Sequence, residues 1–169
     1  MKVFQNIEEF AGAAGADLGT SDWLEIDQDR IDRFADATGD HQWIHVDPQA
    51  AAAGPFGRTI AHGFLTLSLL PVVWKQVYSV EGVTMAVNYG LGEVRFVSPV
   101  PSGAKIRATV KVVEVTRLPG AVQGTLSTTI EIDGIDKPAA VVESIVRYIA
   151  GWGSGWTAAA RSSPGRARA

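Results

Sequence analysis

Cysteine is absent from this chain of 169 residues, which excludes disulfide bonds, thiolate metal sites and cysteine nucleophiles. Long hydrophobic runs are also missing. The longest strongly apolar stretch, residues 63–74, is too short to cross a bilayer and contains Pro71. The N-terminus turns acidic at Glu8 and Glu9 before any apolar run forms, so we expect no secretory signal and a cytoplasmic protein.

An excess of positive charge is missing as well, because 15 basic residues face 18 acidic ones and the net charge is −3. Three arginines and no acids lie in the last twenty residues, so the body of the chain carries −6. Such a body has no broad basic surface, and we expect no nucleic-acid partner. The hydrophobic share of 46% is ordinary for a soluble domain. We expect one domain over residues 1–150 and a flexible tail over residues 151–169, where no periodic pattern is present.

Helix signals fill the first half of the chain. Asn6 and Glu9 have the spacing of a capping box at the start of a first helix. Asp27 can cap a second helix, which Gly39 ends. Asp47 precedes a proline and can cap a third, short helix that runs to about residue 54.

The most apolar helix is expected over residues 62–77. Its side chains leave almost no polar face, and a helix that is apolar all round must be buried on most sides. In a chain of this size, a sheet wrapped around the helix is the natural cover.

Strand signals fill the second half. Apolar residues alternate along residues 105–117, and the alternation slips at Val113 and Val115, which predicts a β-bulge. It resumes over residues 122–132, between turns at Pro119-Gly120 and Asp133-Gly134. We also expect extended segments at residues 84–88 and 93–97, and a central last strand over residues 141–149, which is apolar on both faces. Helices followed by closely connected strands indicate an α+β fold with a mainly antiparallel sheet.

Asp40 and His45 are the first candidates for chemistry. We expect both on a loop between helices, where functional groups often lie. Taken alone, such a pair is more often structural, with the aspartate capping a turn and the histidine bonding a buried backbone group. Here Gly39 permits a sharp turn, and the two side chains can converge on one water molecule. An imidazole titrates near neutrality and can remove a proton from that water.

A metal site is the weaker hypothesis for this segment. His41 and His45 have H-x-x-x-H spacing, which places two ligands on one face of a helix. However, Gly39 and Pro48 limit any helix here, and no third ligand stands at a clear spacing. We therefore expect no metal.

His62 and Gly63 open the apolar helix. Structurally, they mark a helix start with a small residue for tight packing. Functionally, the free N–H of Gly63 can donate to a developing oxyanion, and the missing side chain lets a ligand approach. His62 then serves substrate binding or orients the loop.

These residues resemble the signature of a known family, the MaoC-like dehydratases or (R)-specific enoyl-CoA hydratases. The matching segments are Phe34 to Ala51 with its Gly39-Asp40 and His45, Ala61-His62-Gly63-Phe64-Leu65, Asn88-Tyr89-Gly90, and Arg95-Phe96 with Pro99-Val100. The resemblance covers residues 23–149. One departure is Gln42-Trp43, where the family usually has Asn-Pro.

The resemblance implies a hot-dog fold, which is a curved antiparallel sheet around one long buried helix. It also implies a homodimer and a tunnel for an acyl chain attached to coenzyme A. The implied reaction is reversible addition of water to a trans-2-enoyl-CoA, giving an (R)-3-hydroxyacyl-CoA. Asp40 and His45 would be catalytic, and Gly63 and His62 would hold the thioester oxygen and substrate. No cofactor is implied beyond the coenzyme A of the substrate.

Two alternatives remain open from the sequence. An acyl-CoA thioesterase would use the same fold and bind the same thioester, with water attacking the carbonyl carbon instead. A non-catalytic acyl-CoA-binding or partner subunit would share the fold without the reaction, because fold alone does not fix function.

Overall fold

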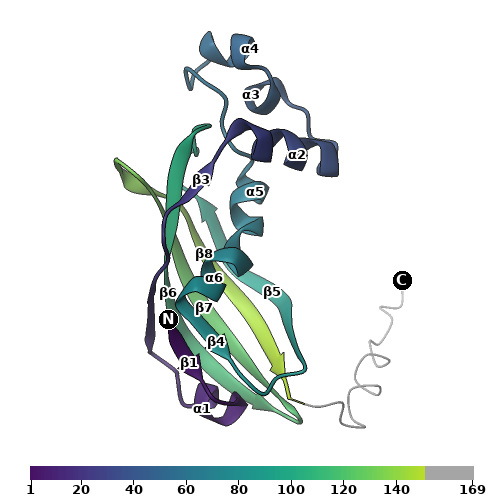
Figure 1. Cartoon of the computed structure of the whole chain (residues 1–169), viewed down its shortest axis with the longest axis vertical. Coiled ribbons are helices and arrows are strands. Elements are labelled where there is room, and N and C mark those ends of the chain that lie inside the picture. Colours follow the sequence, from purple (N-terminus) through teal and green to yellow (C-terminus); the bar gives the residue numbers. More distant parts are fainter. Residues whose placement is uncertain (151–169) are drawn as a thin grey trace, which may run out of the picture.

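A curved sheet wraps around a pair of helices in the computed structural model, which describes residues 1–150 (Figure 1). The tail expected over residues 151–169 lies outside the described residues. The main sheet is antiparallel, and its order is β2 (Asp17–Thr20), β6 (Ala104–Leu118), β7 (Ala121–Ile132), β8 (Ile135–Ile149) and β5 (Met85–Phe96), with β3 (Leu24–Ile26) also paired to β6. A second, parallel pair joins β1 (Lys2–Phe4) to β4 (Tyr78–Val80). This architecture confirms the predicted α+β hot-dog fold.

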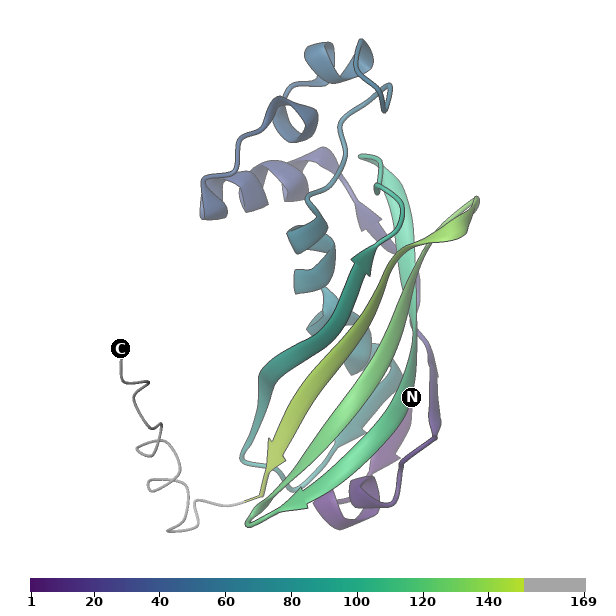
Figure 2. The ribbon, with the colours of Figure 1, turned by 180° about the vertical axis from the view of Figure 1, so that it is seen from behind.

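The helices lie on the concave side of the sheet and at its ends. Their bounds are α1 (Ile7–Ala11), α2 (Gln28–Thr38), α3 (Trp43–Val46), α4 (Pro48–Ala52), α5 (Gly63–Ser68) and α6 (Leu70–Val77). Seen from behind, the outer face of β5 to β8 carries no helix of the described residues (Figure 2). Helices α2 to α4 gather beyond one end of the sheet, above α5 (Figure 1). No helix of residues 1–150 combines the length and hydropathy that a membrane crossing requires.

The expected helix caps are confirmed. The Glu9 N–H donates to the Asn6 side chain at 2.9 Å, and the Arg30 N–H donates to the Asp27 carboxylate at 2.8 Å. The Asp47 carboxylate accepts from the first N–H groups of α4. Gly39 ends α2 in the left-handed conformation, at φ 77°, which glycine adopts without steric cost. That turn delivers the chain directly to Asp40.

The expected single apolar helix is instead two helices that meet at Leu69. The physical reason is Pro71, which has no N–H to continue the α-helical ladder. At the junction, tighter three-residue bonds join Leu69 to Thr66 and Val72 to Leu69, at 3.3 and 3.0 Å. The two helices are also less buried than the sequence predicts, because the Phe64 side chain is 69% exposed and the Val72 side chain is 43% exposed. One side of this helix pair therefore remains open.

The alternating pattern of the strands is confirmed, including the bulge. The even-numbered residues 106 to 112 are fully buried, and the register between β6 and β7 shifts between Val112 and Glu114. Strand β8 lies inside the sheet, between β7 and β5, as expected. The two segments expected near residues 84–88 and 93–97 form one strand, β5, whose register is irregular near Asn88 and after Leu91. The short strands β1, β2 and β4 were not predicted.

Phe10 from α1 closes the far end of the core. Its side chain is 0% exposed and packs against the rings of Phe4 and Tyr148, with centroids 5.2 and 4.8 Å away. Gly124 faces it from β7, and a Cβ there would come within 2.8 Å of the Phe10 ring. The glycine in the apolar alternation of β7 therefore leaves the space that the phenyl ring fills.

Replacing Phe10 with alanine should destabilise the fold by about 3–5 kcal/mol, because a fully buried ring leaves a cavity behind. The measurement is urea unfolding at fixed protein concentration. Val113→Ala is the matched control, since Val113 is 48% exposed on β6, and it should change the free energy by less than about 0.5 kcal/mol. Equal losses in both variants would contradict the central role of Phe10.

Candidate active site

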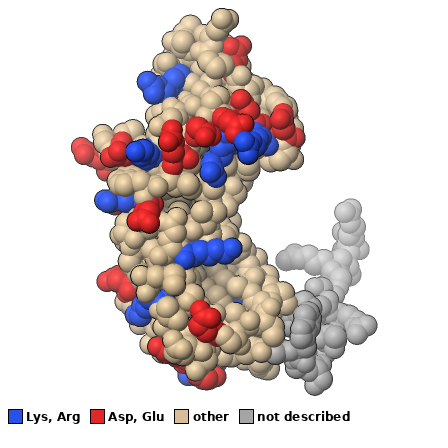
Figure 3. All heavy atoms as spheres, in the orientation of Figure 1, with Lys and Arg blue, Asp and Glu red and all other residues tan. Residues whose placement is uncertain are grey.

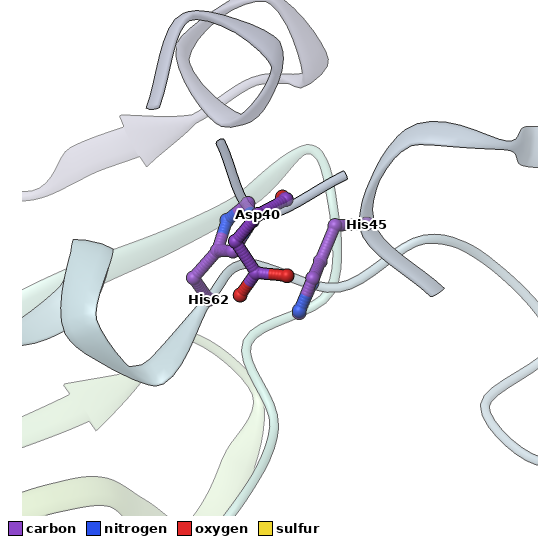
Figure 4. Close-up of side chains that lie close together, drawn as sticks. All are labelled: Asp40, His45 and His62. Atoms are coloured by element: carbon purple, nitrogen blue, oxygen red, sulfur yellow. The ribbon is translucent and has the colours of Figure 1, made fainter. Parts of the chain in front are cut away.

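Asp40 and His45 converge in space although they come from different elements. Asp40 follows the end of α2, and His45 lies on α3, a helix of 4 residues. The expectation that both lie on a loop is therefore wrong for His45. Figure 4 shows the Asp40 carboxylate directed towards the tip of the His45 ring. One carboxylate oxygen of Asp40 and one ring nitrogen each of His45 and His62 lie within 4.8 Å of one another. A water molecule can bridge polar groups at such a separation.

The tautomer of His45 follows from one hydrogen bond. Its Nδ1 lies 2.7 Å from the carbonyl oxygen of Ile60. A carbonyl only accepts, so Nδ1 carries the proton and Nε2 of the neutral ring keeps a free lone pair. That lone pair is on the side of the ring that faces Asp40 (Figure 4). The ring is thus arranged to accept a proton from a water held beside the carboxylate.

Burial lowers the pKa of His45 below its ordinary value of 6.5, because the charged ring loses hydration. The bond to the Ile60 carbonyl and the charge of Asp40 act in the opposite direction, and the neighbouring His62 adds to the lowering. The net direction favours the neutral ring. A neutral His45 at physiological pH is the form that can act as a base.

His62 holds both members of the pair. Its Nε2–H donates to the backbone carbonyl of Asp40 at 2.9 Å. Its ring stacks on His45 with centroids 3.7 Å apart and also packs against Phe34 at 5.1 Å. The side chain is 3% exposed, and its Nδ1 has no hydrogen-bond partner within residues 1–150. This geometry fits the orienting role considered for His62.

Gly63 lies beside His45 on the wall of a cavity of about 300 Å³. As the first residue of α5, it has an N–H with no carbonyl partner inside the helix. A Cβ at Gly63 would come within 3.2 Å of the Phe96 ring. The absence of a side chain therefore lets the Phe96 ring, which lines the same cavity, pack against the start of α5.

The three clustered residues could each offer one atom to a metal ion. However, His45 Nδ1 and His62 Nε2 are already bonded to carbonyl oxygens. The two rings are also stacked on each other at an interplanar angle of 26°. His41, the other candidate ligand, is exposed and lies 3.7 Å from Asp36. The donor geometry fits acid–base chemistry better than metal binding.

Gln28 is a supporting residue that the sequence did not reveal. Its side-chain amide donates to the His45 carbonyl oxygen at 2.7 Å, and its own oxygen accepts from the buried Thr59 hydroxyl at 2.5 Å. It therefore ties α2 to α3 and to the segment that precedes α5. No local pattern signals this contact, since the three residues are far apart in the chain.

The departure at Gln42-Trp43 has a structural counterpart. Trp43 begins α3, and its ring lies against Gly54, where a Cβ would come within 2.9 Å of two ring carbons. A glycine two residues after α4 thus makes room for the indole. Trp43 therefore packs against Gly54, and His45 keeps its hydrogen bond to the Ile60 carbonyl oxygen.

Comparison with known proteins identifies relatives of this chain. Residues 9–132 match the MaoC like domain family. The chain is 58% identical to 3-hydroxyacyl-thioester dehydratase Z of Mycobacterium tuberculosis over 151 residues, which are 89% of this chain and 100% of the relative. It is 47% identical to nodulation protein N of Rhizobium leguminosarum over 128 residues, which are 74% and 80% of the two chains.

Among solved structures, R-hydratase PhaJ1 of Pseudomonas aeruginosa is similar with a TM-score of 0.65 and 25% identity, over 85% of this chain and 86% of that one. The match to the domain and the extent of the identity lead to one conclusion. The chain belongs to the MaoC-like dehydratase family and is a hydro-lyase.

Proposed function

We propose that the protein is an (R)-specific enoyl-CoA hydratase, which adds water reversibly to a trans-2-enoyl-CoA and gives an (R)-3-hydroxyacyl-CoA. The observation that carries the proposal is the unprotonated Nε2 of His45, which faces the Asp40 carboxylate beside the cavity that Gly63 lines. The dehydratase name of the mycobacterial relative and the R-hydratase name of the structural neighbour support the reaction and its stereochemistry.

In the proposed step, Asp40 and His45 hold one water molecule between them. His45 Nε2 accepts a proton as the water oxygen bonds to C3 of the substrate. The electron pair of the C2–C3 double bond moves to C2 in the same step. Asp40, which orients the water, takes the proton from the His45 imidazolium and delivers it to C2 on the same face. The pair returns to its starting state, and the sum of the step is the addition of one water across the double bond.

The Gly63 N–H supports the same step by donating to the thioester oxygen as it gains enolate character. One donor of this kind is typically worth about 3 kcal/mol of transition-state stabilisation. Acid–base chemistry and this donor suffice for the reaction, so we propose no metal or redox cofactor. Coenzyme A is part of the substrate, and we propose a cytoplasmic site of action.

We further propose a homodimer. Strand β5 is an edge strand, bonded to β8 on one side only within the described sheet, and unprotected edges pair with other chains. Large exposed apolar side chains border it: Phe64, Val72, Tyr89, Leu91, Phe96 and Val97. The ring of Phe64 on α5 packs against the ring of Phe96 on β5, with the two centroids 6.1 Å apart. This contact joins the helix and the strand into one apolar surface. Charged side chains gather over α2 instead (Figure 3). A second copy of the chain fits this surface.

Asp40→Asn and His45→Gln should each lower kcat for hydration of a short enoyl-CoA by about a hundred- to ten-thousandfold, the usual contribution of an acid or base group. The measurement is loss of absorbance of the conjugated thioester. His41→Gln is the matched control, because His41 lies in the same segment and is exposed, and it should retain normal turnover.

Near-normal turnover of either variant, in a folded protein, would remove that residue from the mechanism. A reagent that detects free thiols, added to the same assay, distinguishes hydration from hydrolysis of the thioester. Hydration leaves coenzyme A attached, whereas a thioesterase releases a free thiol. Chiral analysis of the product tests the (R) configuration.

The pH dependence of kcat/KM should reflect the lowered pKa of His45. Only the neutral ring accepts a proton from water, so activity should hold as the pH falls to the ordinary histidine value of 6.5 and decline only below it. The His45→Gln variant should lose this acidic limb. An acidic limb centred above pH 6.5 in the native enzyme would contradict the assignment.

Val72→Asp should convert the dimer to a monomer, because it buries a charge in the proposed interface without a partner. Light scattering after size-exclusion chromatography measures the mass. Val113→Asp, on the exposed side of β6, should leave the dimer intact. A native protein that elutes as a monomer at micromolar concentration would disprove the proposal.

A further inference from the structure

The short helix α3 cannot satisfy the carbonyl groups of its own backbone. It has 4 residues, and the last four carbonyl groups of an α-helix have no partner within that helix. The carbonyl of Trp43 accepts from the N–H of Asp47 at 3.0 Å, just beyond the helix. The carbonyl of His45 accepts from the side-chain amide of Gln28, the first residue of α2, at 2.7 Å. A side chain from another helix therefore holds the main chain of the catalytic histidine.

The orientation of the Gln28 amide follows from its three neighbours. The His45 carbonyl oxygen and an oxygen of the Asp32 carboxylate each lie 2.7 Å from one end of the amide. Both groups only accept hydrogen bonds, so this end is the NH₂ group, and each of its hydrogens has its own acceptor. The amide oxygen at the other end accepts from the Thr59 hydroxyl at 2.5 Å. A carboxylate cannot replace this amide, because it has no hydrogen to donate.

These bonds complete a closed ring of contacts around His45. Its main chain is joined through Gln28 to the side chain of Thr59. Its imidazole Nδ1–H donates to the carbonyl of the next residue, Ile60, at 2.7 Å. The main chain and the ring of one residue are thus attached to two consecutive residues of the segment before α5. Loss of the Gln28 amide opens this ring and leaves the imidazole bond to hold His45 against the segment.

Gln28 lies outside the space that the substrate would enter. The cavity of about 300 Å³ at the candidate active site is lined by His45 and Ile60 but, among the described residues, by neither Gln28 nor Thr59. Thr59 is 3% exposed, and Gln28 is half-buried. A side chain outside the cavity wall does not touch the substrate. Any effect of Gln28 on the reaction therefore passes through His45.

We propose that Gln28 is a positioning residue for the reaction. Its amide fixes the main chain of His45, so that the imidazole stays bound to the Ile60 carbonyl and Nε2 stays directed at the water beside Asp40. This inference rests on the proposed hydratase function and deepens it, because it names the group that keeps the base in place. Misplacing a catalytic group by about 1 Å can lower a rate about a hundredfold.

Gln28→Ala should lower kcat for hydration of a short enoyl-CoA about ten- to a hundredfold and change KM by less than about twofold. The base moves, whereas the wall of the cavity keeps its residues. The variant should fold, because the Ile60 N–H still donates to the Ile44 carbonyl and keeps α3 beside the segment. Gln49→Ala is the matched control, since Gln49 is exposed at the start of α4, and it should keep the native kcat. Native kcat in Gln28→Ala, or a loss that lies in KM alone, would overturn the inference.

Gln28→Glu separates hydrogen bonding from shape. Glutamate has the same length and can still accept from Thr59, but its second oxygen would face the His45 carbonyl, which also only accepts. We expect kcat at neutral pH to fall at least as far as in Gln28→Ala. Thermal unfolding should show no matching loss of stability, because an acidic residue in the first turn favours helix α2. Native kcat in Gln28→Glu would mean that Gln28 only fills space, and the inference would fail.

A spectroscopic measurement tests the inference without any reaction. The chain has 3 histidines, and nitrogen NMR of isotopically labelled imidazoles distinguishes protonated from unprotonated ring nitrogens. The His45 signals, identified by their loss in His45→Gln, should show the Nδ1–H tautomer alone in the native protein and in Gln49→Ala. In Gln28→Ala they should show exchange between the two tautomers.

The two measurements fail in different ways. A native protein that hydrates no enoyl-CoA would defeat the proposed function, while a changed tautomer in Gln28→Ala would still show that Gln28 positions the ring. Normal hydration by the native protein, with His45 signals in Gln28→Ala identical to the native ones, would defeat the positioning role alone.

Discussion

The bond between His45 Nδ1 and the Ile60 carbonyl, at 2.7 Å, is the constraint on which the site depends. It selects the tautomer that leaves Nε2 free, and it fixes the plane of the ring. Ile60 is itself held, because its N–H donates to Ile44 at 3.0 Å and the next N–H, of Ala61, donates to Val100 at 2.8 Å. The segment before α5 is therefore clamped between α3 and the loop before β6. A base fixed in this way needs little reorganisation when the substrate arrives.

Burial gives the site its chemical character. His45 is 6% exposed and His62 is 3% exposed, and the two rings stack closely. Protonating His45 would place a poorly hydrated charge beside a second imidazole, and both effects lower its pKa. Asp40, in contrast, is exposed and keeps its hydration. The fold thus places a neutral base next to a solvated carboxylate, and this difference in environment separates their roles.

The interrupted helix links the site to its surroundings. Because α5 ends at Ser68 and α6 begins at Leu70, the helix is interrupted beside a cavity of about 540 Å³ that it lines together with β5 and β8. The same helix pair leaves Phe64 and Val72 exposed, next to a strand with an unpaired edge. One face of the helix pair therefore fills the core, and another forms the apolar surface proposed for a second copy.

Local features were determined by the sequence alone. The caps at Asn6, Asp27 and Asp47 depend on hydrogen bonds over two or three residues, and the bulge near Val113 follows from a slip in a two-residue period. The family resemblance singled out Asp40, His45 and Gly63. The tertiary structure alone decided the contacts made over long chain separations: the pairing of β1 with β4 and the bond from Gln28 to His45. Such contacts depend on how the sheet curves and which strands meet, and no pattern within a few residues encodes that geometry.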